Sequence, residues 1–163
     1  MTIRLYRDDD LTALHAANQA SVPGVSTETL DDLALWIEMA TCLVATDTDN
    51  RALGFITLMA LGLSAYPSPN MRWFESYADA SGKAVVYVDR IALLPEARGK
   101  RLGDALYRAA FDHFSDLDEI ANSTLDAGTD LESGHPGFND PAYRKGRAEI
   151  DTYARDYSHG DLV

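Results

Sequence analysis

The stretch that decides the fold covers residues 84–106 and reads AVVYVDRIALLPEARGKRLGDAL. Its first half, residues 84–94, is rich in β-branched and aromatic side chains, which predicts the strongest strand of the chain. Pro95 ends this strand. Apolar side chains then recur at helical spacing over residues 102–114 and predict a helix. The chain therefore contains a strand, a tight loop and a helix in direct succession.

The loop between this strand and this helix is a candidate anion site. A helix N-terminus presents free N–H groups and the positive end of the helix dipole. Gly99 and Gly103 let the backbone come close to a ligand, and Arg98, Lys100 and Arg101 gather positive charge in a chain of net charge −12. A pyrophosphate would suit this place. Neither the Walker sequence nor the three-glycine dinucleotide fingerprint is present. A solvated helix cap with a basic patch is the alternative.

The same segment resembles the signature of the GNAT acetyltransferases, Gln/Arg-x-x-Gly-x-Gly/Ala after a strand that ends in an apolar-x-apolar-x-Pro pattern. Arg98 matches the first position and Gly103 the last, whereas Arg101 stands where the family usually has glycine. The resemblance implies that the loop binds the pyrophosphate of acetyl-coenzyme A and that the strand end pairs with the pantetheine arm. The pantetheine residues would then be Ile91, Ala92 and Leu93. The loop residues of the site would be Arg98, Gly99, Lys100, Arg101, Leu102, Gly103 and Asp104.

A narrower resemblance, to an uncharacterised bacterial GNAT subfamily, covers residues 18–107. It is carried by Asn18, Val22-Pro23, Tyr66-Pro67-Ser68-Pro69-Asn70, Arg72-Trp73-Phe74 and Tyr87-Val88-Asp89-Arg90-Ile91. The long connection before the main strand is then a subfamily feature. The expected walls of an acceptor pocket are Asn18, Asn70, Trp73, Phe74 and Tyr87. For the aromatic residues, packing against the core is an equally good alternative.

The order of predicted elements agrees with the GNAT fold independently of the motif. Further strands are expected at residues 2–6, 41–46, 51–61, 120–125 and 148–157, a helix from Leu11, a second helix capped by Ser26 or Thr27, and a short helix from Pro69. Gly54 inside a strand indicates a bulge or a close backbone approach. We expect an α/β (α+β) GNAT fold, with a mixed, mostly antiparallel central sheet flanked by helices. Residues 1–163 form one domain in this interpretation, with the weakest pattern from about residue 116 onward.

Asp89 is the candidate general base, because an acceptor amine must lose a proton before its lone pair can attack. Simple alternation along the strand places Asp89 on the same face as Tyr87 and Ile91, with Arg90 on the opposite face. The alternative role for Asp89 is an ion pair or hydrogen bond that organises the strand, with Arg90 as a partner. Both roles stay open.

Tyr143 is the candidate general acid for the leaving thiolate. GNAT enzymes often use a tyrosine in an aromatic-Tyr-x-Lys-x-Gly-Phe stretch, and residues 142–147, AYRKGR, resemble it imperfectly. Ala142 replaces the aromatic residue, and Arg147 stands where phenylalanine is usual. An ordinary surface or packing tyrosine is the alternative. Backbone N–H groups at Leu93 would stabilise the oxyanion.

Composition excludes several classes of function. A net charge of −12 disfavours nucleic acids and anionic membranes and suits a cationic acceptor, with plain solubility as the preferred explanation of the charge. Cys42 is the only cysteine, is expected to be a buried core thiol, and permits no disulfide. The four histidines show no metal-ligand spacing, so no metal is expected. We see no signal peptide or membrane-spanning run and expect a soluble, cytoplasmic protein.

The function that these features predict is N-acetyl transfer from acetyl-CoA directly to a primary amine of a small molecule or peptide. A non-catalytic GNAT-fold module that binds coenzyme A as a sensor or scaffold is the alternative. A third interpretation is an oligomerising structural protein without affinity for coenzyme A. Strand edges near the C-terminus would allow a homodimer, and the sequence names neither the acceptor nor the preferred acyl chain.

Overall fold

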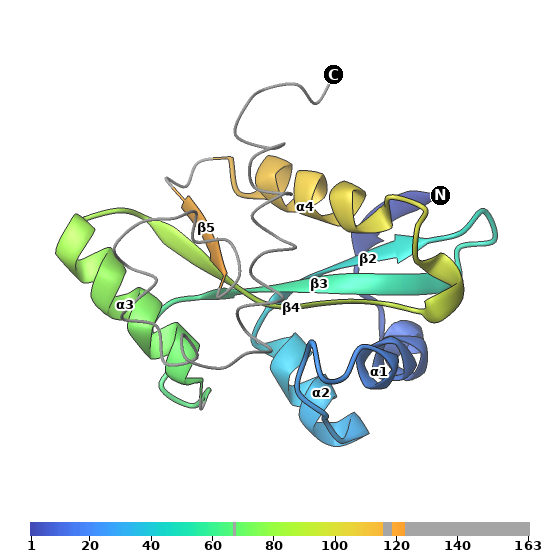
Figure 1. Cartoon of the computed structure of the whole chain (residues 1–163), viewed down its shortest axis with the longest axis horizontal. Helices are drawn as coiled ribbons and strands as arrows, with labels where there is room; N and C mark the ends of the chain where they lie inside the picture. The colour runs from blue at the N-terminus through green and yellow to red at the C-terminus, as the bar shows by residue number, and fades with distance from the viewer. Residues whose placement is uncertain (67, 116–118, 123–163) are drawn as a thin grey trace.

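A mixed sheet forms the centre of the molecule (Figure 1), and the computed structural model describes residues 1–66, 68–115 and 119–122. The strands in this part of the chain are β1 (Thr2–Leu5), β2 (Thr41–Thr46), β3 (Ala52–Ala60), β4 (Val85–Leu93) and β5 (Glu119–Asn122). They lie in the order β1-β2-β3-β4-β5. The first three pairings are antiparallel, and β4 pairs with β5 in parallel. The predicted mixed, mostly antiparallel sheet is confirmed.

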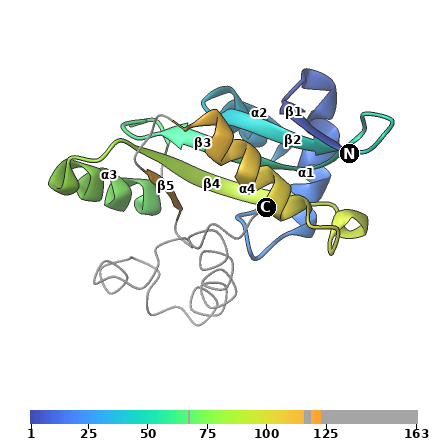
Figure 2. The same ribbon diagram turned by 90° about the horizontal axis from the view of Figure 1, so that it is seen from above.

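Helices cover both faces of this sheet. They are α1 (Leu11–Ala20), α2 (Leu30–Glu38), α3 (Pro69–Ser81) and α4 (Leu102–His113), with short 3-10 turns η1 (Asp8–Asp10) and η2 (Pro95–Ala97). Figures 1 and 2 show α4 on one face, α1 and α2 on the other, and α3 beside the end of the sheet where β4 begins. Leu106 of α4 packs with Val88 in one core cluster. Leu14 and Leu33 pack with Phe55 in the cluster on the other face.

Two helix boundaries differ from the sequence prediction. The side-chain oxygen of Thr29 caps α2 by accepting a hydrogen bond from the Asp32 N–H at 3.1 Å, so the predicted caps at Ser26 and Thr27 are wrong. Ser26 and Thr27 instead belong to the loop between α1 and α2. The helix that begins at Pro69 is 13 residues long, because Ser68 caps its start and Gly82, in the left-handed region at φ 68°, ends it.

A β-bulge at Asp89 changes which side chains share a face of β4. Arg90 pairs with Thr57 and Val88 pairs with Leu58, so Asp89 is the extra residue on β4. An extra residue shifts the side-chain alternation by one position. Val88 therefore lies under α4, whereas Arg90 two residues later turns to the face of α1. The expectation that simple alternation separates Asp89 from Arg90 is wrong for this reason.

Gly54 marks a close approach between β3 and β4. A Cβ atom at this position would lie 2.5 Å from the carbonyl oxygen of Ala92, which is too close for any side chain. The register between β2 and β3 also shifts between Ala45 and Thr46, one residue away from the partner of Gly54. The predicted close backbone approach at Gly54 is confirmed. Gly54 pairs with Leu93, the last residue of β4.

Within the described residues, none of the helices combines the length and apolar character that a membrane-spanning helix requires.

Candidate functional site

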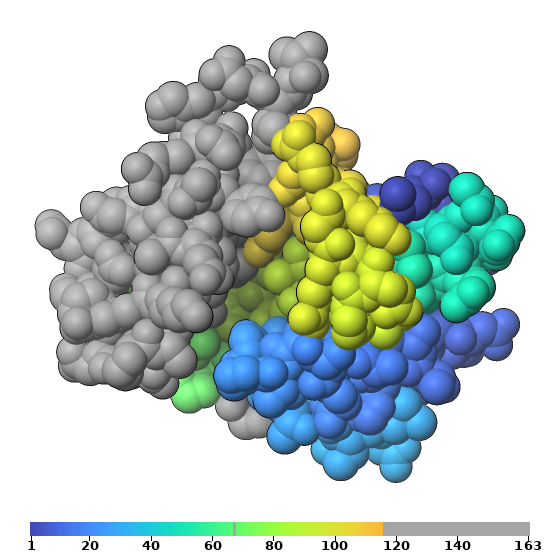
Figure 3. Space-filling view, turned by 45° about the vertical axis from the view of Figure 1, so that its right-hand side comes forward, coloured from blue at the N-terminus to red at the C-terminus, as the bar shows by residue number. Residues whose placement is uncertain are grey.

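A cavity of about 440 Å³ opens where β4 ends and α4 begins. We call it the β4–α4 cavity. Its lining residues are Ala20, Ser21, Val22, Ile91, Ala92, Leu93, Arg98, Gly103 and Tyr107. The end of β4 and the first turn of α4, predicted together from the motif, thus meet in one cavity with the end of α1. Figure 3 shows the yellow loop and start of α4 directly against the blue segment that follows α1.

The loop that leads into α4 borders this cavity at Arg98, and α4 itself borders it at Gly103. Gly99 and Arg101 adopt left-handed conformations at φ 73° and 59°, which turn the chain sharply into the helix. A left-handed backbone favours glycine, so the conformation of Arg101 is compatible with the glycine that the GNAT signature usually has at this position. A Cβ atom added at Gly103 would meet no heavy atom within 4 Å. The cavity therefore reaches Gly103 in the first turn of α4, and the free N–H groups of a first helical turn are what an anion site requires.

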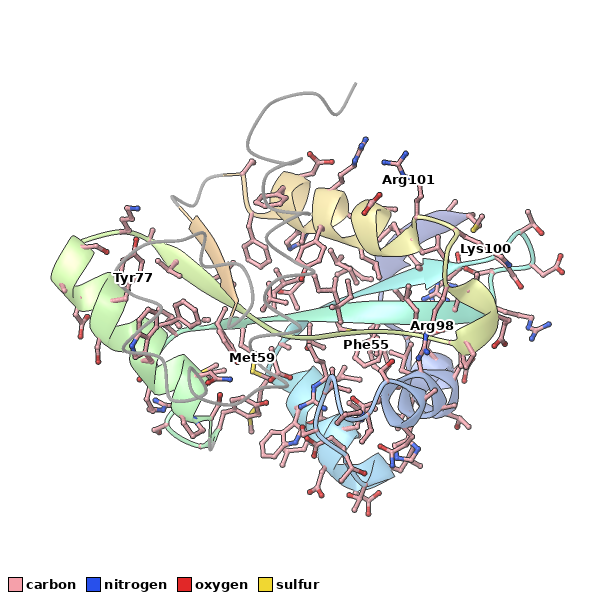
Figure 4. The ribbon with its side chains drawn as sticks, in the orientation of Figure 1. Phe55, Met59, Tyr77, Arg98, Lys100 and Arg101 are labelled. Atoms are coloured by element: carbon pink, nitrogen blue, oxygen red, sulfur yellow. The ribbon has the colours of Figure 1, made fainter. Side chains whose placement is uncertain are left out.

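The three cations of the loop have different roles. Arg98 donates hydrogen bonds to the carbonyl oxygen of Ala20 at 2.7 Å and to that of Leu93 at 3.4 Å, so it ties the end of α1 to the end of β4. Lys100 and Arg101 are exposed, and Arg101 contacts Asp104 at 3.0 Å. In Figure 4, Arg98 points toward α1, while Arg101 points away from the sheet.

A second cavity, of about 370 Å³, lies beside the start of α3. We call it the β4–α3 cavity. Its lining residues are Gly24, Val25, Ser26, Glu28, Trp36, Tyr66, Ser68, Pro69, Asn70, Tyr87, Asp89 and Arg90. Of the predicted acceptor walls, Asn70 and Tyr87 line it, together with the predicted base Asp89.

Three other predicted wall residues lie outside the lining of this cavity. Trp73 and Phe74 pack edge to face with ring centroids 4.8 Å apart, and Phe74 lies 5.8 Å from Tyr87 between ring centroids. Phe74 is buried in the cluster under α3, where the apolar contacts of its helix face place it. Asn18 is fully buried and accepts a hydrogen bond from Arg90, so it supports the cavity from behind.

Arg90 is the centre of a buried polar cluster at the bulge. Its Nε donates to Asp89 Oδ2 at 2.5 Å, its Nη1 to Asn18 Oδ1 at 3.2 Å, and its Nη2 to Glu28 Oε1 at 3.1 Å. The same Nη2 is 3.3 Å from the hydroxyl oxygen of Tyr66. Burial acts to lower the pKa of Arg90, but the Asp89 carboxylate and Tyr66 outweigh it and raise that pKa. Arg90 therefore remains a cation that joins β4, α1, the α1–α2 loop and the segment before α3.

Asp89 is held on both of its carboxylate oxygens. The Tyr66 hydroxyl donates to Oδ1, whereas Arg90 and, at 3.5 Å, Thr57 donate to Oδ2. The ion pair with Arg90 is the organising contact that the sequence allowed for Asp89. Burial, followed by the nearby Asp89 carboxylate, raises the pKa of Tyr66 and raises the pKa of Tyr87 to about 12. Both phenols stay protonated at neutral pH.

Within the described residues, neither a nucleophilic Cys42 nor a metal site is supported. Burial raises the pKa of the Cys42 thiol, which suits the predicted core role and not a nucleophile. No group of three or more His, Cys, Asp or Glu side chains in the described ranges could hold a metal ion. Tyr143, the predicted general acid, lies outside the described residues.

Sequence reasoning missed Glu28 as a site residue. It immediately follows Ser26 and Thr27, whose side chains were interpreted as helix caps, and so its segment was assigned to a helix start. Trp36 was likewise passed over on α2. No local pattern identifies either residue, because their proximity to Arg90 depends on how α1, α2 and β4 pack.

Comparison with known proteins identifies the class of protein. The sequence model of the acetyltransferase (GNAT) family matches residues 11–132, about three quarters of the chain. The chain belongs to this family. The predicted membership of the GNAT superfamily is therefore confirmed.

Solved structures share this fold at low sequence identity. A glucosamine N-acetyltransferase region of a fungal multi-domain GH3 β-N-acetylglucosaminidase is 21% identical with a TM-score of 0.60, covering 93% of this chain and 16% of that one. The ribosomal-protein-alanine N-acetyltransferase of Brucella melitensis biovar Abortus 2308 is 19% identical with a TM-score of 0.55, covering 94% and 91%. AAC(6')-Iy, with the bisubstrate analogue CoA-S-monomethyl-acetylneamine, is 17% identical with a TM-score of 0.50, covering 85% and 88%.

The C-terminal third has a second relationship that the sequence analysis did not find. The sequence model of biopterin-dependent aromatic amino acid hydroxylases matches residues 111–163. Phenylalanine-4-hydroxylase of Dictyostelium discoideum is 55% identical over 49 residues, which are 30% of this chain and 11% of that protein. The chain thus spans about a tenth of the length of the curated relatives it matches. Tyr143 lies within the matched segment, and its poor fit to the GNAT tyrosine pattern was the available signal.

Proposed function

We propose that this chain transfers an acetyl group from acetyl-CoA directly to a primary amine of a small molecule or peptide. One observation carries the proposal: β4 lines both cavities with successive residues. Ile91, Ala92 and Leu93 line the β4–α4 cavity, and Asp89 and Arg90 line the β4–α3 cavity. A thioester in the first cavity and an amine in the second would meet at the bulge.

The β4–α4 cavity fits the donor in shape and chemistry. The open first turn of α4 at Gly103 suits a pyrophosphate, and Lys100 and Arg101 stand on the same loop. The apolar side chains of Ile91 and Leu93 suit the pantetheine arm. The solved complex of AAC(6')-Iy, in which coenzyme A and an acceptor are parts of one analogue, supports direct transfer between neighbouring sites.

The reaction balances without an acyl-enzyme. The neutral amine attacks the acetyl carbonyl carbon, the C–S bond breaks, and coenzyme A leaves as a thiolate. One proton leaves the ammonium before attack, to a carboxylate of the β4–α3 cavity, and a second passes from the acetylated nitrogen to the thiolate. Asp89 as the base and Tyr143 as the acid stay predictions, as does one GNAT domain that extends to residue 163.

One observation favours a second function, that of a non-catalytic coenzyme A-binding sensor or scaffold. Both carboxylate oxygens of Asp89 are already engaged by Tyr66 and Arg90. A base that is held in this way would leave the β4–α4 cavity as the functional part of the molecule. The two functions differ in turnover and share the affinity for coenzyme A.

Two measurements on the purified chain test the proposal. Calorimetric titration of acetyl-CoA at low ionic strength should show micromolar binding that the Lys100→Glu/Arg101→Glu variant weakens. This pair is preferable to Arg98→Glu, because Arg98 also ties α1 to β4. Release of free thiol with a panel of primary amines should then show turnover. Binding without turnover on any amine would support the sensor, and no binding by folded protein would sink both functions.

A further inference from the structure

We infer that Glu28 is the carboxylate that binds the acceptor ammonium and accepts its proton, and that the acceptor is a cationic amine without a neighbouring carboxylate. This rests on the proposed function and deepens it. Glu28 belongs to the loop between α1 and α2, which lines both cavities. Ala20, Ser21 and Val22 line the β4–α4 cavity. The β4–α3 cavity is lined further along the chain by Gly24, Val25, Ser26 and Glu28.

The contacts of Glu28 leave it better placed than Asp89 to receive an amine. Its Oε1 accepts from Ser26 Oγ at 2.7 Å and from Arg90 Nη2 at 3.1 Å. Within the described residues its Oε2 accepts one hydrogen bond, from Trp36 Nε1 at 3.2 Å. A carboxylate oxygen has two acceptor positions, so Oε2 can accept another hydrogen bond. The side chain of Glu28 is 15% exposed and that of Asp89 is 5% exposed.

Arg90 separates the roles of the two carboxylates. It contacts Asp89 through Nε and Glu28 through Nη2, and Asp89 also receives the Tyr66 hydroxyl. Asp89 thus fixes the orientation of Arg90 and Tyr66, and we assign it a positioning role. Glu28, held at Oε1 by Arg90 and at Oε2 by Trp36, is a carboxylate of fixed direction in the cavity lining.

The charge and shape of the cavity define the acceptor class. Among its described lining residues, Glu28 and Asp89 are acidic and Arg90 is basic, so the lining carries a net negative charge. Trp36 and Tyr66 stand edge to face with ring centroids 5.0 Å apart. An ammonium beside a carboxylate and aromatic rings is stabilised by ionic and cation–π attraction.

The same features select against a free α-amino acid. Its carboxylate would lie close to Glu28 and Asp89, and the guanidinium of Arg90 is buried with its hydrogen bonds directed to four protein groups. Like charges at such distances repel strongly in a partly desolvated cavity. Phenethylamine and phenylalanine form a matched pair for this test, since they differ only by the carboxylate.

The experiment measures steady-state thiol release by the full chain with acetyl-CoA and each of these two amines. Wild type should show a kcat/KM for phenethylamine at least about 100-fold above that for phenylalanine. Glu28→Gln should lower kcat for phenethylamine by about 100-fold or more, the usual range for loss of a general base, with the Kd of acetyl-CoA unchanged within twofold. Glu28→Asp, which keeps a carboxylate, should recover part of the loss. Glu38→Gln, which removes an exposed carboxylate from the same α2 region, is the charge-matched control.

The outcomes separate this inference from the proposed function. If wild type binds acetyl-CoA but acetylates no amine, the proposed function fails, and the proton-accepting role of Glu28 fails with it. If wild type is active and Glu28→Gln keeps its kcat, or loses acetyl-CoA binding together with kcat, the catalytic assignment is overturned. Equal use of phenylalanine and phenethylamine would overturn the assigned acceptor class.

Discussion

The two cavities that meet at β4 are lined by different parts of the fold. The β4–α4 cavity is lined mainly by one stretch of chain, from the apolar end of β4 to the open Gly103 position at the start of α4, and is completed by Ala20, Ser21 and Val22. The β4–α3 cavity is formed by polar and aromatic side chains from α2, β4 and the segments that follow α1 and precede α3. The first depends on local chain geometry, and the second depends on tertiary packing around Arg90.

This difference predicts that a substitution can damage one cavity and leave the other intact. Loss of Arg90 should damage the fold around the β4–α3 cavity, because the groups it joins lie far apart in the sequence. Loss of the open space at Gly103 should damage ligand binding and leave the fold intact. Four measurements test the comparison.

The largest effect is expected for Arg90→Met. This variant leaves Asp89 and the partly buried Glu28 without their common partner, and breaking a buried ion pair from one side typically costs about 3–5 kcal/mol. Urea unfolding should show this decrease in the free energy of unfolding. Arg108→Met, at an exposed position of α4, should change it by less than about 0.5 kcal/mol. Equal stability of Arg90→Met and wild type would show that the cluster contributes no net stability.

Gly103→Leu should weaken ligand binding without lowering the stability of the fold. The added Cβ meets no heavy atom within 4 Å, and leucine has a higher helix propensity than glycine by about 0.8 kcal/mol. The free energy of unfolding should therefore stay equal or rise, while the side chain fills the β4–α4 cavity. Acetyl-CoA affinity should fall by about 100-fold, which corresponds to roughly 2.7 kcal/mol. Calorimetry and urea unfolding on the same sample measure both quantities, and retained affinity would place the ligand elsewhere.

The sequence predicted the β4 and α4 sides of the first cavity because these parts are neighbours in the chain, whereas the contribution of Ala20, Ser21 and Val22 was not predicted. The pattern of strand, proline, glycine and helix was sufficient to bring Ile91, Leu93 and Gly103 together. The left-handed conformation of Arg101 was not predicted, although it is compatible with the glycine that the GNAT signature usually has there. Most strands and helices were predicted to within two residues for the same local reasons.

The second cavity was predicted only in part, because its geometry depends on a bulge. Alternation places Asp89 and Arg90 on opposite faces, and one extra residue in β4 reverses this. Glu28 enters the site only because the α1–α2 loop passes over β4, which no periodicity reveals. Asn18 and Asn70 were selected as polar residues without a structural explanation, and this criterion found residues at or behind the cavity.

Alkaline pH should weaken the region of the second cavity first. The pKa of Tyr87 is raised to about 12, whereas an unfolded tyrosine titrates near pH 10. Folding therefore keeps a proton that the unfolded chain loses, and the stability from Tyr87 is fully present below about pH 10 and is lost as the pH approaches 12. Tyr66 changes in the same direction. Urea unfolding should show a decrease of about 1 kcal/mol from Tyr87 alone between roughly pH 9 and pH 11. Tyr87→Phe should remove that part of the pH dependence, and an unchanged slope would contradict the raised pKa.

The smallest effect is expected for Lys100→Glu in the loop before α4. Lys100 is exposed, so its attraction for a pyrophosphate acts through solvent and is screened within about 10 Å at 0.1 M salt. Acetyl-CoA affinity should fall several-fold at low ionic strength, and the difference from wild type should shrink at about 0.5 M salt. Arg108→Glu, further along α4, gives the control for a change in net charge alone. A salt-independent loss would mean that Lys100 is in direct contact with the ligand. Ligand binding in the β4–α4 cavity would then also depend on a charged side chain.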